Sequence, residues 1–135
     1  MKRVLNYFLG FYALNNLVRG GIHAFAPDGG AHSIAGLDLS TNTQTILALF
    51  ALMGFQQIAQ GLFQAYILWR RRDLVRLMLT FQALETALGV YNLYFHRVMP
   101  VIVPGEIINA ILLVLLIAVL GASIIFKEPS TRPSI

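Results

Sequence analysis

The sequence predicts an all-α integral membrane protein, folded as one antiparallel four-helix transmembrane bundle with its N- and C-termini in the cytoplasm. The chain of 135 residues is 57% hydrophobic and only 12% charged, whereas a soluble domain typically has about 25% charged residues. Four segments each supply the roughly 20 mostly apolar residues that a membrane-spanning helix requires. Basic residues gather beside alternate ends of these segments, a pattern that marks cytoplasmic loops.

We expect the four helices at residues 4–25, 46–69, 74–95 and 107–126. None of these segments shows the strict alternation of a transmembrane strand, so helices are favoured over a β-barrel. Residues 1–127 then form a single domain, followed by a polar, proline-containing tail at 128–135 that we expect to be disordered.

The first helix follows Lys2 and Arg3, and the loop after it contains several glycines, which predicts an irregular connection over the mouth of the bundle. Ser40, Thr41 and Asn42 are candidate N-caps of the second helix. The positive-inside rule places the loop at 26–43 outside the cell, because the basic residues gather at the other ends of the helices.

The second and third helices are joined by a basic turn, Arg70–Asp73, which the positive-inside rule places in the cytoplasm. Pro100 and Pro104 precede the fourth helix. Proline is favoured in a first helical turn, and Glu106 would lie near the positive end of the helix dipole. The expected membrane is the bacterial cytoplasmic (inner) membrane.

Composition also limits the classes of function. The net charge of +4 is explained by basic residues at helix ends, so we expect no nucleic-acid partner. The absence of cysteine excludes thiol nucleophiles and thiolate metal sites. We expect no metal and no cofactor, because His23 and His96 are only a weak pattern for a haem. Small residues at Gly61 and Ala65, four positions apart, permit close helix packing within the monomer or in a homo-oligomer.

Each predicted helix carries polar residues within its apolar stretch, and these define the candidate site. Intramembrane ionisable groups are costly, so they are expected to face one another and not the lipid. At 100° per residue the polar residues of each helix fall on one side. We therefore predict a polar cavity that opens to the outer face. The candidate catalytic residues are Glu85, Glu106 and His23, and the candidate ligand-binding residues are Arg19, Asn15, Gln57, Gln60, Asn92, Asn109 and Tyr12.

Arg19 stays protonated in essentially any protein environment and requires an anionic partner, for which Glu85 is the first candidate. Glu106, nearer the mouth, would serve as a general acid if desolvation raised its pKa. Two structural alternatives remain open. An Arg–Glu pair can simply fix helix register, and a row of glutamines is often used for helix–helix hydrogen bonds.

The leading functional hypothesis is binding of a small amphipathic ligand, such as a lipid, isoprenoid or quinone, with conversion by acid–base chemistry as an open question. If the protein is an enzyme, isomerisation, cyclisation or hydration is the class these residues support. Membrane lipid and this ligand are then the expected partners. The alternatives are a proton- or cation-coupled transporter and an accessory or scaffold subunit of a membrane complex.

The plan of the chain resembles small bacterial four-span membrane proteins of the DoxX-like kind. The resemblance rests on Arg19-Gly20-Gly21 near the outer end of the first helix, on Gly54 and Gly61 in the second, and on Glu106-Ile107-Ile108-Asn109 at the start of the fourth. It covers most of the chain. It implies a four-helix membrane bundle and assigns no active-site residue, because these families are functionally diverse.

Overall fold

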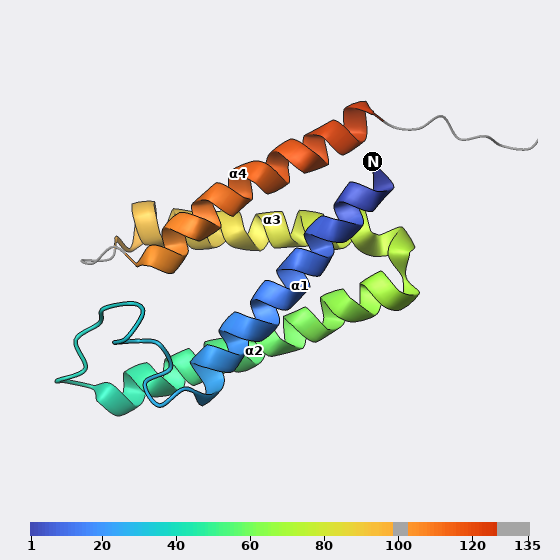
Figure 1. Cartoon of the computed structure of the whole chain (residues 1–135). Helices are drawn as coiled ribbons and strands as arrows, with labels where there is room; N and C mark the ends of the chain where they lie inside the picture. The colour runs from blue at the N-terminus through green and yellow to red at the C-terminus, as the bar shows by residue number, and fades with distance from the viewer. Residues whose placement is uncertain (99–102, 127–135) are drawn as a thin grey trace, which may run out of the picture.

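The computed structural model describes residues 1–98 and 103–126. Within these ranges the chain is all helical, which confirms the predicted class (Figure 1). The predicted tail at 128–135, Lys127 and Pro100 lie outside the described residues. The elements in order are α1 (Lys2–Phe25), α2 (Thr43–Arg70), the 3-10 turn η1 (Arg72–Leu74), α3 (Val75–Tyr91), the π-helical turn η2 (Asn92–His96) and α4 (Pro104–Ile125).

The helix ends follow local sequence signals. Asn42 is the N-cap of α2, with a φ of 57° in the left-handed region, which asparagine tolerates better than most residues. Its side chain makes no capping hydrogen bond. Pro104 and Glu106 occupy the first turn of α4, as the sequence predicts. The third predicted helix, 74–95, is divided, because α3 ends at Tyr91 and continues as the wider turn η2.

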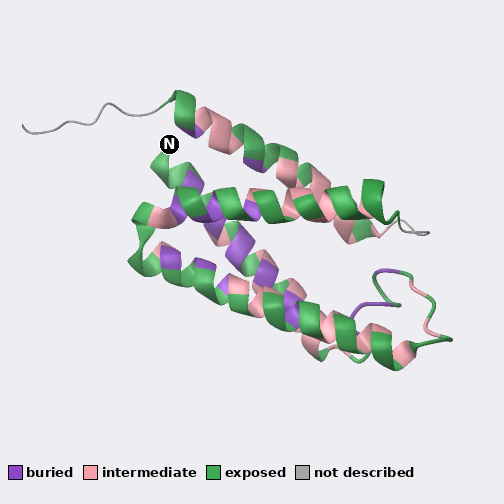
Figure 2. Ribbon diagram, turned by 180° about the vertical axis from the view of Figure 1, so that it is seen from behind, coloured by how far each residue is buried: buried purple, intermediate pink, exposed green. Residues whose placement is uncertain are grey.

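Helix α1 is the central helix of the bundle. It carries buried residues along its length, whereas the buried residues of α4 are Leu116 and Ser123 (Figure 2). It packs along α2 and also contacts α3 and α4. The contact with α2 is backbone to backbone: a Cβ atom on Gly54 would lie 2.5 Å from the Ala24 nitrogen and 2.7 Å from the Gly20 carbonyl oxygen. Gly20 and Gly54 therefore set the distance between these two helices.

Consecutive long helices run in opposite directions, so the connections gather at two ends of the bundle (Figure 1). One end holds the start of α1, the turn η1 and the end of α4. We call it the cationic end, because it carries Lys2, Arg3, Arg70–Arg72 and Arg76. There Arg76 donates a hydrogen bond to the Ser123 carbonyl oxygen at 3.1 Å, which joins α3 to α4. The loop between α1 and α2 and the turn η2 lie at the opposite end.

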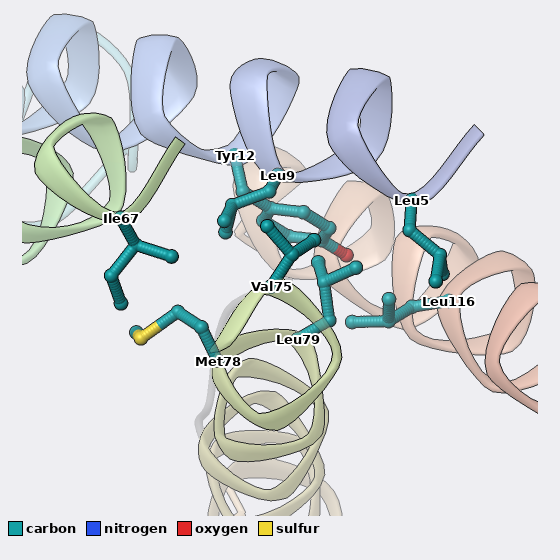
Figure 3. Packing of buried hydrophobic residues seen from close by; sticks show 8 residues of the cluster. All are labelled: Leu5, Leu9, Tyr12, Ile67, Val75, Met78, Leu79 and Leu116. Atoms are coloured by element: carbon teal, nitrogen blue, oxygen red, sulfur yellow. The ribbon is translucent and has the colours of Figure 1, made fainter. Parts of the chain in front are cut away.

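An apolar core fills the half of the bundle next to the cationic end. Side chains from all four helices meet there (Figure 3). Leu9, Leu79 and Leu116 are fully buried, so α1, α3 and α4 share one packed layer. The apolar core consists of Leu5, Leu9, Tyr12, Ile67, Val75, Met78, Leu79 and Leu116.

Two helices, α2 and α4, are long and apolar enough to cross a membrane. Helix α1 carries Lys2, Arg3 and Arg19, and α3 has only 17 residues before the π-helical turn. Two helices of this kind are consistent with a membrane protein, but they do not establish that all four helices cross the membrane. Four membrane spans therefore remain a prediction.

Candidate functional site

A cavity of about 290 Å³ lies in the half of the bundle away from the cationic end. All four long helices and η2 contribute to its walls. We call it the polar cavity, because most of its lining side chains carry polar groups. These are Tyr12, Asn15, Asn16, Arg19, Gln56, Gln57, Gln60, Gln82, Glu85, Thr86, Asn92, Glu106 and Asn109; Met53, Gly89, Leu93 and Leu112 complete the lining.

The floor of the polar cavity is a network of carboxamide side chains around Gln82. The Gln82 Oε1 atom accepts hydrogen bonds from Gln64 Nε2 at 2.7 Å, Gln60 Nε2 at 3.1 Å and Asn16 Nδ2 at 3.5 Å. Asn16 Nδ2 also donates to Gln64 Oε1 at 3.1 Å. Gln64 is fully buried. One amide group of α3 thus joins α1 and α2, which supports the interpretation of the glutamine stripe as helix–helix bonding at this level.

Glu85 lies one turn beyond this network on α3 and points toward α2. Its Oε2 atom accepts a hydrogen bond from Gln60 Nε2, and a longer one from Gln82 Nε2 at 3.5 Å. The side chain is exposed at the open side of the cavity. The carboxyl group is therefore positioned by neutral amides, and one of its oxygens accepts no protein hydrogen bond among the described residues.

Arg19 points toward α4, and the expected direct pairing with Glu85 is wrong. Its Nη1 atom donates to Asn109 Oδ1 at 2.8 Å, and Asn109 Nδ2 donates to Glu106 Oε1 at 3.3 Å. Within the described ranges, neither carboxyl group of the cavity forms an ion pair with Arg19. The physical reason is that Asn109 on α4 offers an acceptor to Arg19, while the hydrogen bond from Gln60 holds Glu85 toward α2. Each ionisable group thus has a neutral amide as its partner.

Gln57 supplies the least satisfied polar atom of the cavity. Its Oε1 atom is buried, and no donor in the described part of the chain reaches it. A buried acceptor without a hydrogen bond costs about 1–3 kcal/mol. Tyr12, by contrast, is satisfied, because its hydroxyl group donates to the Leu112 carbonyl oxygen at 3.2 Å. Among the described residues, Gln57 Oε1 is thus the buried side-chain acceptor of the cavity that has no hydrogen bond.

A second pocket, also of about 290 Å³, adjoins the polar cavity. The two share Arg19, Met53, Leu93 and Glu106. We call it the apolar pocket, because the remaining side chains that line it are mostly hydrophobic. Its further lining residues are Ile22, His23, Gly30, Ile34, Ala35, Leu37, Phe50, Val103 and Gly105.

His23 belongs to the apolar pocket and does not line the polar cavity. Its Nδ1 atom lies 2.7 Å from the Gly29 carbonyl oxygen, and its ring packs edge-on against Phe50. His23 follows Arg19 by one turn of α1, and this places it beyond the polar cavity and next to the loop. The expected grouping of His23 with Glu85 and Glu106 around one chamber is therefore not formed.

The loop between α1 and α2 forms part of the wall of the apolar pocket through Gly30, Ile34, Ala35 and Leu37. Asp28 organises this loop. Hydrogen bonds from the backbone N–H groups of Ser33 and Gly30, and from the Ser33 hydroxyl group, lower the pKa of Asp28 to about 2. The hydrogen bonds to the Asp28 carboxylate therefore stabilise the folded conformation of this loop.

The structure brings nine of the ten predicted site residues to one cavity: Tyr12, Asn15, Arg19, Gln57, Gln60, Glu85, Asn92, Glu106 and Asn109. The prediction omitted three buried residues from the site, Asn16, Gln64 and Gln82, although each belongs to a polar stripe. Gln64 and Gln82 each lie one turn closer to the cationic end than the chosen Gln60 and Glu85, whereas Asn16 directly follows the chosen Asn15. Among the described residues, no group of three or more His, Asp or Glu side chains is placed to hold a metal ion.

Comparisons with protein-family models, with curated proteins and with solved structures find no match to this chain. The DoxX-like resemblance therefore stays a prediction. A functional conclusion for this chain depends on the geometry of the polar cavity and the apolar pocket alone.

Proposed function

We propose that this protein binds a small amphipathic molecule within a membrane, with the polar end in the polar cavity and the apolar part in the adjoining apolar pocket. The observation that carries the proposal is the contact between the two spaces. Arg19 and Glu106 lie at their shared boundary. A ligand with one polar and one apolar end matches such a pair of spaces, since binding sites combine apolar walls with a few placed polar groups.

A membrane setting for all four helices is part of this proposal. Each helix exposes large apolar side chains, for example Leu14 at 62%, Leu52 at 64%, Leu88 at 59% and Val114 at 67%. Apolar surface of this extent is unusual on a soluble monomer and suits contact with lipid. The 17 residues of α3 and the 5 of η2 together provide a third helical segment of spanning length.

Binding is favoured over transport by the position of the apolar core. Leu9, Leu79 and Leu116 fill the bundle between the polar cavity and the cationic end, so a polar solute would have no polar path through this half. Acid–base conversion of the occupant by Glu85 or Glu106 stays a prediction. His23 lies 2.7 Å from the Gly29 carbonyl oxygen and shares the apolar pocket with Glu106, but it does not line the polar cavity with Glu85.

The test is native mass spectrometry of the full chain purified in a mild non-ionic detergent. We expect a mass addition of a few hundred daltons, a size that suits cavities of this kind, and identification of the released molecule after solvent extraction. The double variant Glu85→Gln/Glu106→Gln should lose it. Asp73→Asn is the matched control, because it neutralises a carboxylate at the cationic end. An unmodified mass for the wild-type protein, extracted gently and at several detergent concentrations, would contradict the proposal.

A further inference from the structure

We infer that the polar end of the ligand is a hydrogen-bond-donating cation of the primary ammonium class. The inference rests on the proposed function and narrows it from an amphipathic molecule to an amphipathic amine. It is drawn from the charges and the free acceptors of the polar cavity.

The charge of the lining favours a cation. Two carboxyl groups, Glu85 and Glu106, and one guanidinium group, Arg19, line the polar cavity. As ionised groups, two negative charges and one positive charge leave an excess of one negative charge. An anionic head group would increase this excess, whereas a monovalent cation cancels it. Opposite charges within a few ångströms attract each other, and more strongly where the site is partly shielded from water.

The hydrogen-bonding groups of the polar cavity also favour a cation that donates hydrogen bonds. Arg19 donates to Asn109 through Nη1 and keeps further N–H groups. The Gln60 and Gln64 amide groups donate to Gln82, and Gln60 also donates to Glu85. The unused groups include acceptors: Gln57 Oε1, which is buried without a partner in the described part of the chain, and the second oxygen of Glu85. An ammonium group has three N–H donors and no acceptor. It therefore supplies what these two atoms lack.

The two acceptors lie on facing walls. Gln57 precedes Gln60 by one turn of α2, and Gln60 reaches across to Glu85 on α3. Both Gln57 and Glu85 line the polar cavity. A head group held between α2 and α3 would donate to Glu85, and also to Gln57 once that buried side chain turns into the cavity. The chain it carries would enter the apolar pocket past Met53 and Leu93, which line both spaces.

The experiment measures binding of four ten-carbon probes to the full chain in nanodiscs of phosphatidylcholine, with empty nanodiscs as the partition control. Decylamine carries charge and donors, decanol carries a donor only, decyltrimethylammonium carries charge only, and decanoate carries a negative charge. We expect decylamine to bind at least tenfold more tightly than each of the others, since hydrogen bonds to charged groups contribute about 1.5–3 kcal/mol.

Two variants assign the effect to the cavity. Glu85→Gln should reduce decylamine affinity by about tenfold or more and change decanol affinity little. Gln57→Leu should reduce the preference for decylamine over decyltrimethylammonium, because the trimethyl group has no N–H donor. Asp73→Asn is the control and should leave all four affinities unchanged.

The outcomes separate this inference from the proposed function. Binding of decanoate or decanol as tight as that of decylamine would overturn the ammonium inference and leave the amphipathic site intact. Binding of all four probes no greater than to empty nanodiscs would overturn the proposed function. An unchanged decylamine affinity in Glu85→Gln would overturn the inference as well.

Discussion

The two halves of the bundle use the same four helices for different purposes. Next to the cationic end, Leu5, Leu9 and Leu79 pack in a dry core. Toward the opposite end, Asn16, Arg19 and Glu85 surround a cavity. The core is closed and apolar, whereas the cavity is open on one side and contains a buried acceptor that no described residue satisfies. The packed core and the candidate site are therefore separated along the helix axes.

The boundary between the halves can be followed along single helices. The inward face of α3 carries Val75 and Leu79 and then Gln82 and Glu85, at steps of three or four residues. Side chains at this spacing lie on one face of a helix. The inward face of α1 changes in the same way, from Leu5 and Leu9 to Asn16 and Arg19. On each of these helices the inward face thus changes from apolar residues that line the core to polar residues that line the cavity.

The largest effect on stability is expected in the apolar core. Leu79→Ala should reduce the free energy of unfolding by about 2–5 kcal/mol, because it leaves a cavity among fully buried side chains. Unfolding in mixed detergent micelles measures this. The control is Leu84→Ala on the same helix, where the leucine is 55% exposed and the cost should be small. Equal losses in both variants would mean that this half of the bundle is not packed as described.

A smaller effect is expected at the boundary. Gln82→Leu removes the acceptor shared by Asn16, Gln60 and Gln64 and should cost about 1–3 kcal/mol, because buried donors lose a partner. Gln44→Leu, in the exposed first turn of α2, makes the same chemical change without touching the network. A Gln82→Leu protein more stable than the wild type would contradict a role of this network in holding the helices together.

The smallest effect is expected in the loop that walls the apolar pocket. The pKa of Asp28 is lowered to about 2, below its ordinary value of about 3.9. Its carboxylate therefore stabilises the loop fully above the ordinary pKa, and this contribution is lost as the pH falls toward 2. The amide proton shifts of Gly30 and Ser33, followed by NMR, should titrate with a midpoint near 2. A midpoint at the ordinary pKa would contradict the hydrogen-bonded loop, and Asp28→Asn should abolish the titration.

The helical class, the approximate helix ranges and the sides of the helices that carry polar groups could all be predicted from the sequence alone. The physical reason is that these properties are local: apolar runs of spanning length, Pro104 in a first turn and polar residues at helical spacing each act within one segment. Nine of the ten predicted site residues line one cavity for this reason.

Only the tertiary structure decided which polar groups are partners. Arg19 lies beside Asn109 and not Glu85, and His23 faces the apolar pocket. These contacts depend on how α1 is rotated and on how close α4 lies to α1. Close contact between Gly20 and Gly54 holds α1 against α2, and the direction of each long side chain follows from the competing donors and acceptors within its reach. No pattern within one helix contains that information, because a hydrogen bond between helices is a property of two backbones placed together.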